Sequence, residues 1–348
     1  MKSKIVLVLA SLVIAPLAQA QCVGDVAVDS RVDGGDLGVL LANWGPVTST
    51  ALSRACDLDS SGQVDGADLG ALLANWGSCP GPTWGAVLES QPDPAVVTDA
   101  NLREAIVATG LPWRLRDYGT GIEMLLIPPG TFHMGCITGS DQYGCDSTER
   151  PVHEVTLTSA FYLGRFEVTQ AQWQAQTGSN PSLFQGQLDS ARRPVEQVSW
   201  SSVNFYLSAT GMRLPTEAEW EYACRAGTQT PFYNGSTDDG TVGTLAWFYY
   251  NTCEVGSGCG TRPVGGKLAN VFGFHDMLGN VFEWVNDRYS GYTADPQTNP
   301  TGPASGSIFV LRGGCWENDA YGMRSSYRST GSGFYSDDSV GFRAARTP

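Results

Sequence analysis

Residues 213–227 read RLPTEAEWEYACRAG, and this stretch sets the frame for the larger part of the chain. Thr216 has the side chain of a helix N-cap. Glu219 follows three residues later, which is the spacing of a capping box. The stretch therefore predicts a helix over residues 216–225.

Outward from this helix, the chain from about residue 122 consists of short apolar runs punctuated by glycine, proline and asparagine. MLLIPPGTFHMG, residues 124–135, predicts a strand, a turn at Pro-Pro-Gly and a second strand. Two more short helices are expected at 169–177 and 199–210. The pattern predicts a mixed α+β domain with low secondary-structure content, held together by aromatic packing.

Seven motifs follow one another in this part of the chain. They are IPPGTFHMG (127–135), RPVHEVTLTSAFYLGRFEVTQAQW (150–173), RPVEQVSW (193–200), RLPTEAEWEYACRAG (213–227), FGFHDMLGNVFEWVND (272–287), LRGGCW (311–316) and SVGFRAAR (339–346). Together they resemble the formylglycine-generating enzyme / sulfatase-modifying factor family, from about 122 to 346. The resemblance implies a C-type lectin-like fold.

The family's oxidase holds a copper ion with two cysteines that follow a Gly-Gly-Ser-aromatic stretch. The corresponding positions here are Asn318 and Met323, while Cys315 stands where the family has serine. Two thiolates suit Cu(I), and an amide with one thioether does not replace them. We therefore expect neither copper binding nor formylglycine-generating activity, with an oxidase rearranged around Cys315 as the alternative.

The resemblance also implies calcium sites. In the family, an Asp/Asn-x-x-Gly-Asn-x-x-Glu loop binds calcium, and the matching positions here are Asp276, Gly279, Val281 and Glu283. Carboxylate and carbonyl oxygens from an irregular loop suit this ion. In the family's second calcium loop a carboxylate is missing from this sequence, and we expect a disulfide between Cys253 and Cys259 to replace the ion.

Other signature positions are interpreted as structural. Arg213, Glu219 and Arg343 are expected to tie loops together as buried or half-buried charges. A surface groove lined by Trp316, Asn318, Tyr321 and Arg324 could bind a peptide or a sugar, because aromatic faces beside hydrogen-bonding groups suit both ligands.

The N-terminal part contains an internal repeat. VDGGDLGVLLANWG (32–45) recurs as VDGADLGALLANWG (64–77), with 12 of 14 positions identical. Ahead of the second copy, oxygen-bearing side chains and one carbonyl occupy EF-hand calcium-loop positions: Asp57, Asp59, Ser61, the Gln63 carbonyl, Asp65 and Asp68. The apolar face of the following helix is expected to comprise Leu69, Leu72, Leu73 and Trp76.

The first copy is a weaker match, because Ala27 and Ser30 replace an oxygen ligand and the turn glycine. Its expected calcium ligands are Asp25, Asp29, Asp33 and Asp36. Two calcium loops, each followed by one helix, resemble a dockerin over about 22–79, and we expect a small all-α module. The resemblance implies a cohesin-like or surface scaffold partner; a calcium-stabilised spacer is the other interpretation.

The sequence also predicts an N-terminal signal peptide and the boundaries of the domains. Lys2 and Lys4, an apolar run and Ala18-Gln19-Ala20 predict a signal peptide over 1–20 and export. The expected order is then the repeat module at 21–79, a linker with a short helix at 80–118 and the large domain at 119–348. No segment is long enough to predict a membrane span.

Nine cysteines in an exported chain predict disulfides with at least one cysteine unpaired. Cys136 and Cys145 bracket a short polar loop and are expected to pair. Two of Cys22, Cys56 and Cys79 are expected to pair, while Cys224 and Cys315 either pair with each other or leave a free thiol.

The charge composition of the chain bears on which class of partner it can bind. There are 35 Asp and Glu against 21 Lys and Arg, a net charge of −14, which disfavours a nucleic-acid partner. We expect an exported calcium-binding protein whose large domain is a non-catalytic binding or scaffold domain. One alternative is a formylglycine-generating oxidase that acts on cysteine in sulfatases, or another oxidase with a site rearranged around Cys315. A second alternative is a component of an extracellular polysaccharide-degrading assembly.

Overall fold

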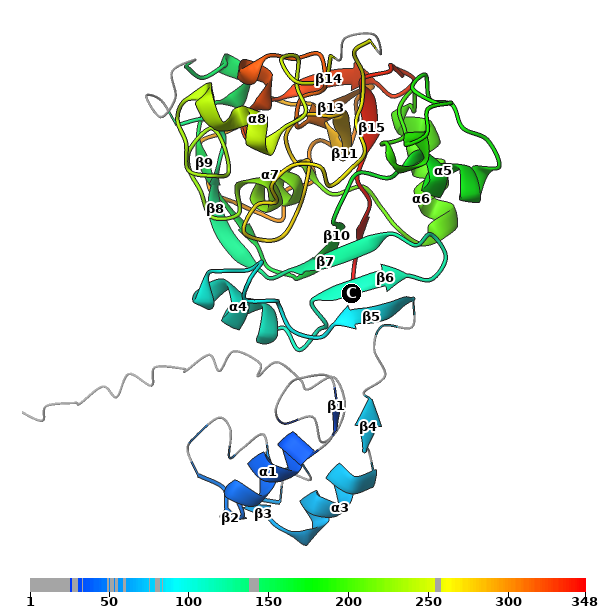
Figure 1. The fold of residues 1–348 in the computed structure, drawn as a ribbon. Helices are drawn as coiled ribbons and strands as arrows, with labels where there is room; N and C mark the ends of the chain where they lie inside the picture. Colours follow the sequence, from blue (N-terminus) through cyan, green and yellow to red (C-terminus); the bar gives the residue numbers. More distant parts are fainter. Residues whose placement is uncertain are drawn as a thin grey trace, which may run out of the picture. The chain divides into compact units, whose positions relative to one another are not determined.

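The computed structural model describes residues 26, 31–32, 34–48, 50, 53, 56–58, 61–74, 76–78, 82, 84–137, 144–253 and 258–348. The chain forms two compact units, Met1–Cys79 and Pro80–Pro348. Figure 1 shows both units and the labels used below. None of the helices among these described residues is long and apolar enough to cross a membrane.

The N-terminal unit repeats its structure as it repeats its sequence. The strand before each helix pairs antiparallel with the strand after the other helix, so that Val32 lies opposite Gly77 and Val64 opposite Gly45. The repeat partners Val32 and Val64, and Leu40 and Leu72, are all fully buried. Its elements are β1 (Arg31–Val32), α1 (Gly34–Ala42), β2 (Gly45–Pro46), β3 (Gln63–Val64), α3 (Gly66–Ala74) and β4 (Gly77–Ser78).

The unit departs from the expected all-α module, because the short ladders satisfy the backbone groups next to the loops. The expected apolar helix face is only partly buried. Leu73 is 51% exposed and Trp76 is 49% exposed, and their repeat partners Leu41 and Trp44 are 51% and 48% exposed. Each repeat therefore presents an equivalent Leu-x-x-Trp pair at its surface.

The large unit contains three sheets, whose strand orders are β16-β10-β7-β6-β5, β14-β13-β11-β15 and β12-β9-β8. Pairing is antiparallel except that β11 runs parallel to β15 and β12 parallel to β9. The strands are β5 (Gly85–Glu89), β6 (Arg114–Asp117), β7 (Glu123–Ile127), β8 (Gly130–Met134), β9 (His153–Leu157), β10 (Phe161–Gly164), β11 (Phe282–Arg288), β12 (Gln297–Thr298), β13 (Ile308–Arg312), β14 (Ser329–Ser332), β15 (Val340–Phe342) and β16 (Ala345–Arg346).

The expected helices are confirmed by their caps. Thr169 and Thr216 each form a capping box, and Ser199 accepts the Ser202 N–H. The helices are α4 (Ala100–Val107), α5 (Gln170–Thr177), α6 (Trp200–Thr210), α7 (Glu217–Arg225) and α8 (Val242–Leu245), with 3₁₀ turns η1 (Ser147–Glu149), η2 (Ser190–Arg192), η3 (Asp239–Thr241) and η4 (Ala320–Met323).

Helix α7 lies in the interior of the large unit and packs on β8, β11 and β13. Its Trp220 is fully buried, and Ala223 and Cys224 join the same core. The stretch 213–227 therefore contains a buried helix of the large unit. The charged side chains of this helix must pair with other groups inside the protein.

The expected linker at 80–118 needs correction. Its short helix exists as α4, capped by Asp99. However, β5 and β6 extend the sheet that begins with β7, and Trp113 and Leu115 are buried in the core. The segment is part of the large unit because its two strands are hydrogen-bonded into that sheet.

Candidate functional site

The segment after β13 is where the resemblance places a catalytic centre. Gly313 and Gly314 adopt φ values of 91° and 72°, which side chains rarely tolerate. A Cβ on Gly314 would lie 2.3 Å from Cε of Met323, so the turn packs directly on that methionine. Met323 is fully buried and belongs to the main core. At one of the two positions where the family's oxidase has a copper-binding cysteine, this chain therefore has a methionine that packs in the core.

Cys315 is buried in the same turn. Its Sγ lies 3.4 Å from Oδ1 of Asn318, and its backbone N–H donates to the same oxygen at 3.1 Å. Burial raises the pKa of the Cys315 thiol to about 12. The residues present here are thus one protonated thiol, one amide and one thioether, and they do not fit a copper ion.

Cys315 and Cys224 are both unpaired and buried. Of the two expectations for these residues, a disulfide between them is therefore excluded. Burial also raises the pKa of Cys224, to about 12, so neither thiol is a ready nucleophile near neutral pH.

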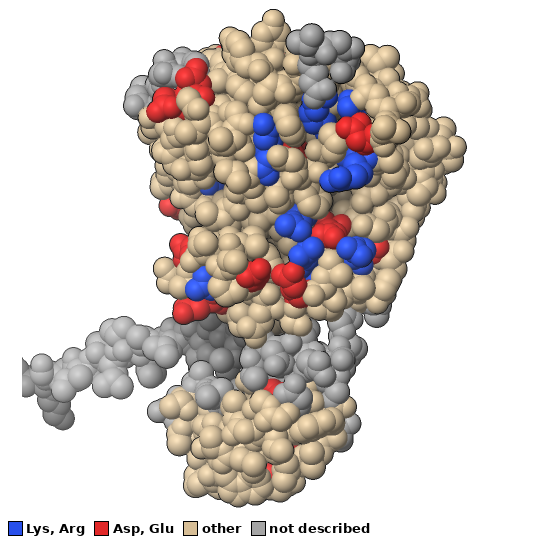
Figure 2. All heavy atoms as spheres, in the orientation of Figure 1, with Lys and Arg blue, Asp and Glu red and all other residues tan. Residues whose placement is uncertain are grey.

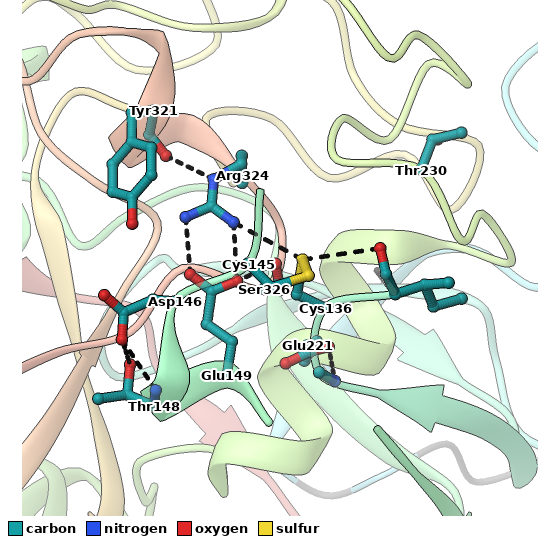
Figure 3. Close-up of a disulfide and its surroundings, with 12 residues drawn as sticks. Cys136, Cys145, Asp146, Thr148, Glu149, Glu221, Thr230, Tyr321, Arg324 and Ser326 are labelled. Carbon is teal, nitrogen blue, oxygen red and sulfur yellow. Dashed lines mark hydrogen bonds and ion pairs between the residues drawn. A yellow bond between two sulfur atoms is a disulfide. The ribbon is translucent and has the colours of Figure 1, made fainter. Parts of the chain in front are cut away.

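Arg324 does not line a surface groove as expected. It is fully buried, and its guanidinium forms a two-armed ion pair with Glu149, with both N–O distances 2.7 Å. Figure 3 shows Glu149 rising from η1 toward the guanidinium, beside the disulfide of Cys136 and Cys145. Sequence reasoning missed Glu149, because nothing in Asp-Ser-Thr-Glu-Arg-Pro marks which acid points inward.

Helix α7 supplies two further buried acids to arginines. Glu221 accepts Nε of Arg225 at 2.8 Å and pairs with Arg312 through its other oxygen. Burial alone would raise the pKa of Glu221, but Arg225 and Arg312 lower it overall. Glu217 forms a two-armed pair with Arg328 at 2.6 and 2.9 Å.

The structural interpretation of the signature charges agrees with the geometry. Arg213 pairs with Glu219 at 2.6 and 2.8 Å, joining the turn before α7 to its first turn. Arg343 pairs with Glu283 and also donates to the Gly164 and His275 carbonyls at 2.8 and 2.9 Å.

The loop at 276–283 contains the residues expected to bind calcium. Glu283 accepts from Arg343 and from the Trp220 indole at 2.7 Å, so its carboxylate serves an ion pair here. Asp276 accepts the Gly265 N–H at 2.6 Å through Oδ2, while its buried Oδ1 has no hydrogen-bond partner. Burial raises the pKa of Asp276 to about 6.

Glu167, which sequence reasoning did not single out, completes this loop. It accepts Nδ2 of Asn280 at 2.7 Å and the Val281 N–H at 3.1 Å. Burial, followed by the charges of Asp276 and Glu283, raises its pKa well above the ordinary value. Asp276 and Glu283, with the Gly279 and Val281 carbonyls, stay the predicted calcium ligands of this loop.

The other loop of the family's calcium pattern is closed covalently. The expected disulfide between Cys253 and Cys259 is confirmed. Next to it, the Thr252 carbonyl accepts Nη2 of Arg262 at 2.6 Å, and Asn251 accepts the Phe248 N–H at 2.9 Å. That this disulfide replaces a calcium ion stays a prediction.

In the N-terminal unit, the second loop is ordered around two aspartates. Asp57 accepts the N–H groups of Ser61 and Gly62 at 2.9 and 3.0 Å. Asp68 is fully buried and accepts those of Leu58 and Asp65 at 2.6 and 2.8 Å. Among the other expected ligands, Asp36 is buried at the start of α1, whereas Asp25, Asp29, Asp33 and Asp59 lie outside the described residues.

Cys56 of this unit is unpaired and buried, while Cys22 and Cys79 lie outside the described residues. The two disulfides of the large unit indicate an oxidising, extracytoplasmic environment.

Three hollows lie on the large unit. One of about 50 Å³ lies among His153, Glu217, Asp287 and Arg328, and one of about 180 Å³ lies beside Arg213 and Glu219. The third is an open hollow of about 780 Å³ bordered by Cys136, Ile137 and residues 150–152. On the face drawn in Figure 2, basic and acidic side chains are interspersed on a largely uncharged surface.

Known proteins share this fold. Treponema denticola variable protein 1 has a TM-score of 0.59 at 29% identity, with 66% of this chain and 98% of that chain covered. PvdO from Pseudomonas aeruginosa has a TM-score of 0.57 at 27% identity, with coverages of 68% and 98%.

Relatives by sequence include the formylglycine-generating enzyme of Streptomyces coelicolor, which is 31% identical over 61% of this chain and 71% of its own length. The mouse enzyme is 31% identical over 61% of this chain, and the match spans 60% of that enzyme. The Chlamydia caviae serine/threonine-protein kinase pkn1 is 34% identical over 64% of this chain, but the match spans only 38% of the kinase. The Sulfatase-modifying factor enzyme 1-like domain matches residues 116–348, and the chain belongs to this family.

Proposed function

We propose that the large domain is a non-catalytic binding or scaffold domain in an exported protein, and that it does not generate formylglycine. The observation that carries this proposal is Met323, whose side chain is buried against Gly314 at a position where the family's oxidase needs a copper-binding thiolate. Asn318 at the other position accepts from Cys315, so this turn is built as hydrogen-bonded packing.

Copper binding and turnover test the proposal together. We expect the chain not to take Cu(I) from a competing chelator. In the presence of oxygen, we expect it not to convert the cysteine of a sulfatase-type peptide, as measured by mass spectrometry. The matched control is the double variant Asn318→Cys/Met323→Cys, which we expect to take Cu(I) from the chelator. Turnover by the unaltered chain, or tight Cu(I) binding lost in Cys315→Ala, would instead establish the rearranged oxidase.

We further propose that the N-terminal unit binds calcium and tethers the chain to a cohesin-like or surface scaffold protein. The ordering of Asp57 and Asp68 around their loop supports the calcium site. The Leu-x-x-Trp pairs exposed equally in both repeats support a partner, because adjacent exposed apolar side chains commonly mark an interaction surface.

A calcium-dependent pull-down from the exported fraction tests the tether. Capture is expected with calcium, and it should be lost with chelator and in Asp57→Ala/Asp68→Ala. Trp44→Ala/Trp76→Ala serves as the partner-face variant, which should bind calcium but lose capture. If the same amount of partner is captured with calcium and with chelator, the N-terminal unit is a spacer and not a calcium-dependent tether. Capture of polysaccharide-degrading enzymes would place the chain in such an assembly.

A further inference from the structure

The two sulfurs of the Cys136–Cys145 disulfide have different surroundings. Cys136 follows β8 and is 4% exposed. Cys145 is only partly buried and leads into η1, where Asp146 accepts the N–H and hydroxyl of Thr148. One sulfur therefore faces the protein interior, and the other lies nearer to solvent.

Arg324 aims a hydrogen-bond donor at the buried sulfur. Its Nη1 lies 3.9 Å from Sγ of Cys136 and 2.7 Å from Oε2 of Glu149. Nη1 carries two hydrogens, so one donor serves each acceptor. Figure 3 shows dashed lines from the guanidinium to the Glu149 carboxylate and to the Cys136 sulfur.

The guanidinium has little freedom to turn away. Its Nε donates to the Tyr321 carbonyl at 3.0 Å, its Nη2 donates to Glu149 at 2.7 Å, and its carbon lies 4.2 Å from the Tyr321 ring centroid. Glu149 is itself fixed by the Ser326 hydroxyl at 2.8 Å. The donor toward Cys136 is therefore held in place before any reaction.

Thiol–disulfide exchange is sensitive to such an asymmetry. A thiolate attacks one sulfur in line with the S–S bond, and the other sulfur leaves as a thiolate. The reaction is faster when the attacked sulfur is accessible and the departing thiolate is stabilised by a nearby cationic donor. Both conditions select Cys145 for attack and Cys136 for departure.

We propose that Cys136–Cys145 is a polarised exchange site for external thiols: the incoming thiolate bonds to Sγ of Cys145, the S–S bond breaks, and Cys136 leaves as a thiolate that accepts the Nη1 hydrogen bond of Arg324. With a monothiol the product is a mixed disulfide at Cys145. With a dithiol, its second thiol displaces Cys145, so the dithiol is oxidised by two electrons to a disulfide, and the protein gains two electrons and two protons as two thiols.

The second disulfide of the large unit is an internal control. Cys253 and Cys259 are both exposed, and Sγ of Cys253 faces the Tyr249 carbonyl at 3.9 Å. Sγ of Cys136 also lies 3.9 Å from a carbonyl oxygen, that of Ile137, so the described difference between the two disulfides is the Arg324 donor. Exchange at Cys253–Cys259 should follow access alone and yield adducts on both cysteines.

Regiochemistry tests the proposal directly. The full chain is treated briefly with glutathione, quenched in acid, alkylated with iodoacetamide and mapped by mass spectrometry. We expect glutathione on Cys145 and the alkyl group on Cys136 in at least about ten molecules for each one with the reverse pattern. Adducts divided evenly, or glutathione placed on Cys136 through the open hollow it borders, would overturn the proposal.

Arg324→Gln isolates the role of the donor. We expect exchange at Cys136–Cys145 to slow about tenfold, with the rate at Cys253–Cys259 unchanged. Because Glu149 would lose its partner, the double variant Arg324→Gln/Glu149→Gln keeps the buried pair neutral and is expected to show the same slowing. If either folded variant exchanges at the parent rate, Arg324 does not assist departure. The regiochemistry of the parent chain decides the proposal even if neither variant folds.

Discussion

The two units use carboxylates in opposite ways. In the large unit, buried acids meet guanidinium groups: Glu149 meets Arg324, Glu217 meets Arg328, and Glu283 meets Arg343. In the N-terminal unit, Asp57 and Asp68 meet backbone N–H groups. In the large unit, the positive charges that pair with these carboxylates come from its own arginines. In the N-terminal unit, the carboxylate oxygens are held around a loop by backbone N–H groups.

The sequences of the two units explain the difference. Residues 21–79 contain eight aspartates and only two arginines, with no lysine or glutamate. Ion pairs within the unit can neutralise few of these charges, so a metal ion would supply what the chain lacks. In the large unit, the buried arginines Arg324, Arg328 and Arg343 each pair with a glutamate of the same unit.

Breaking one internal pair should have the largest effect on this contrast. Glu221→Gln removes the buried carboxylate that pairs with both Arg225 and Arg312, and it leaves the fully buried Arg312 with Glu217 at 3.5 Å. Removing one partner from a buried ion pair costs about 3–5 kcal/mol, and we expect the free energy of unfolding of the large unit to fall by that amount. Urea unfolding monitored by tryptophan fluorescence would measure it.

Arg116→Ala is the matched control for that measurement. Arg116 also pairs with a glutamate, Glu123, at 2.7 Å, but its side chain is 53% exposed. Solvent screens such pairs, so we expect a loss below about 1 kcal/mol. Equal losses in the two variants would mean that burial does not set the value of these ion pairs.

Calcium removal should have the next largest effect, confined to the N-terminal unit. If the Asp57–Asp68 loop binds calcium as proposed, a free concentration of 100 times Kd stabilises the unit by about 2.7 kcal/mol. Calorimetry should show a low-temperature transition that moves down with chelator, while the transition of the large unit stays in place. Asp68→Asn should abolish the shift, and a transition insensitive to chelator in the parent would contradict the calcium site.

Local patterns predicted the helices of the large unit well. Thr169, Ser199 and Thr216 identify their N-termini because capping depends on residues within one turn. The two short-range disulfides were predictable for the same reason, since each closes a loop of few residues. For the turn at 313–324, the sequence predicts from Asn318 and Met323 that copper does not bind, and this stays a prediction.

Partners that are distant in the sequence were not predictable. Arg324 was expected at a surface groove, yet Glu149, 175 residues away, draws it into the core. Glu167 reaches Asn280 across 113 residues. The prolines and glycines of residues 80–118 predict a linker, whereas β5 and β6 gain their stability from pairing with the sheet that starts at β7.

The smallest expected effect concerns Asp287, a buried acid beside α7 that accepts a hydrogen bond from a backbone N–H group. Asp287 accepts the Glu217 N–H at 2.9 Å, and burial, reinforced by the charge of Glu217, raises its pKa from 3.8 to about 8. Its stabilising contribution is complete below pH 3.8 and is lost as pH rises through about 8, because unfolding releases the carboxyl to ionise.

Asp287→Asn keeps a neutral side chain at every pH. We therefore expect the variant to match the parent near pH 4 and to exceed it by about 1–3 kcal/mol above pH 8. Urea unfolding at a series of pH values would measure the difference, with Asp189→Asn, which removes a carboxylate that pairs with Arg193, as the comparison variant. If Asp287→Asn is less stable than the parent at alkaline pH, Asp287 is ionised in the fold. Its charge would then be stabilised by the arginines of the large unit, as the other acids are.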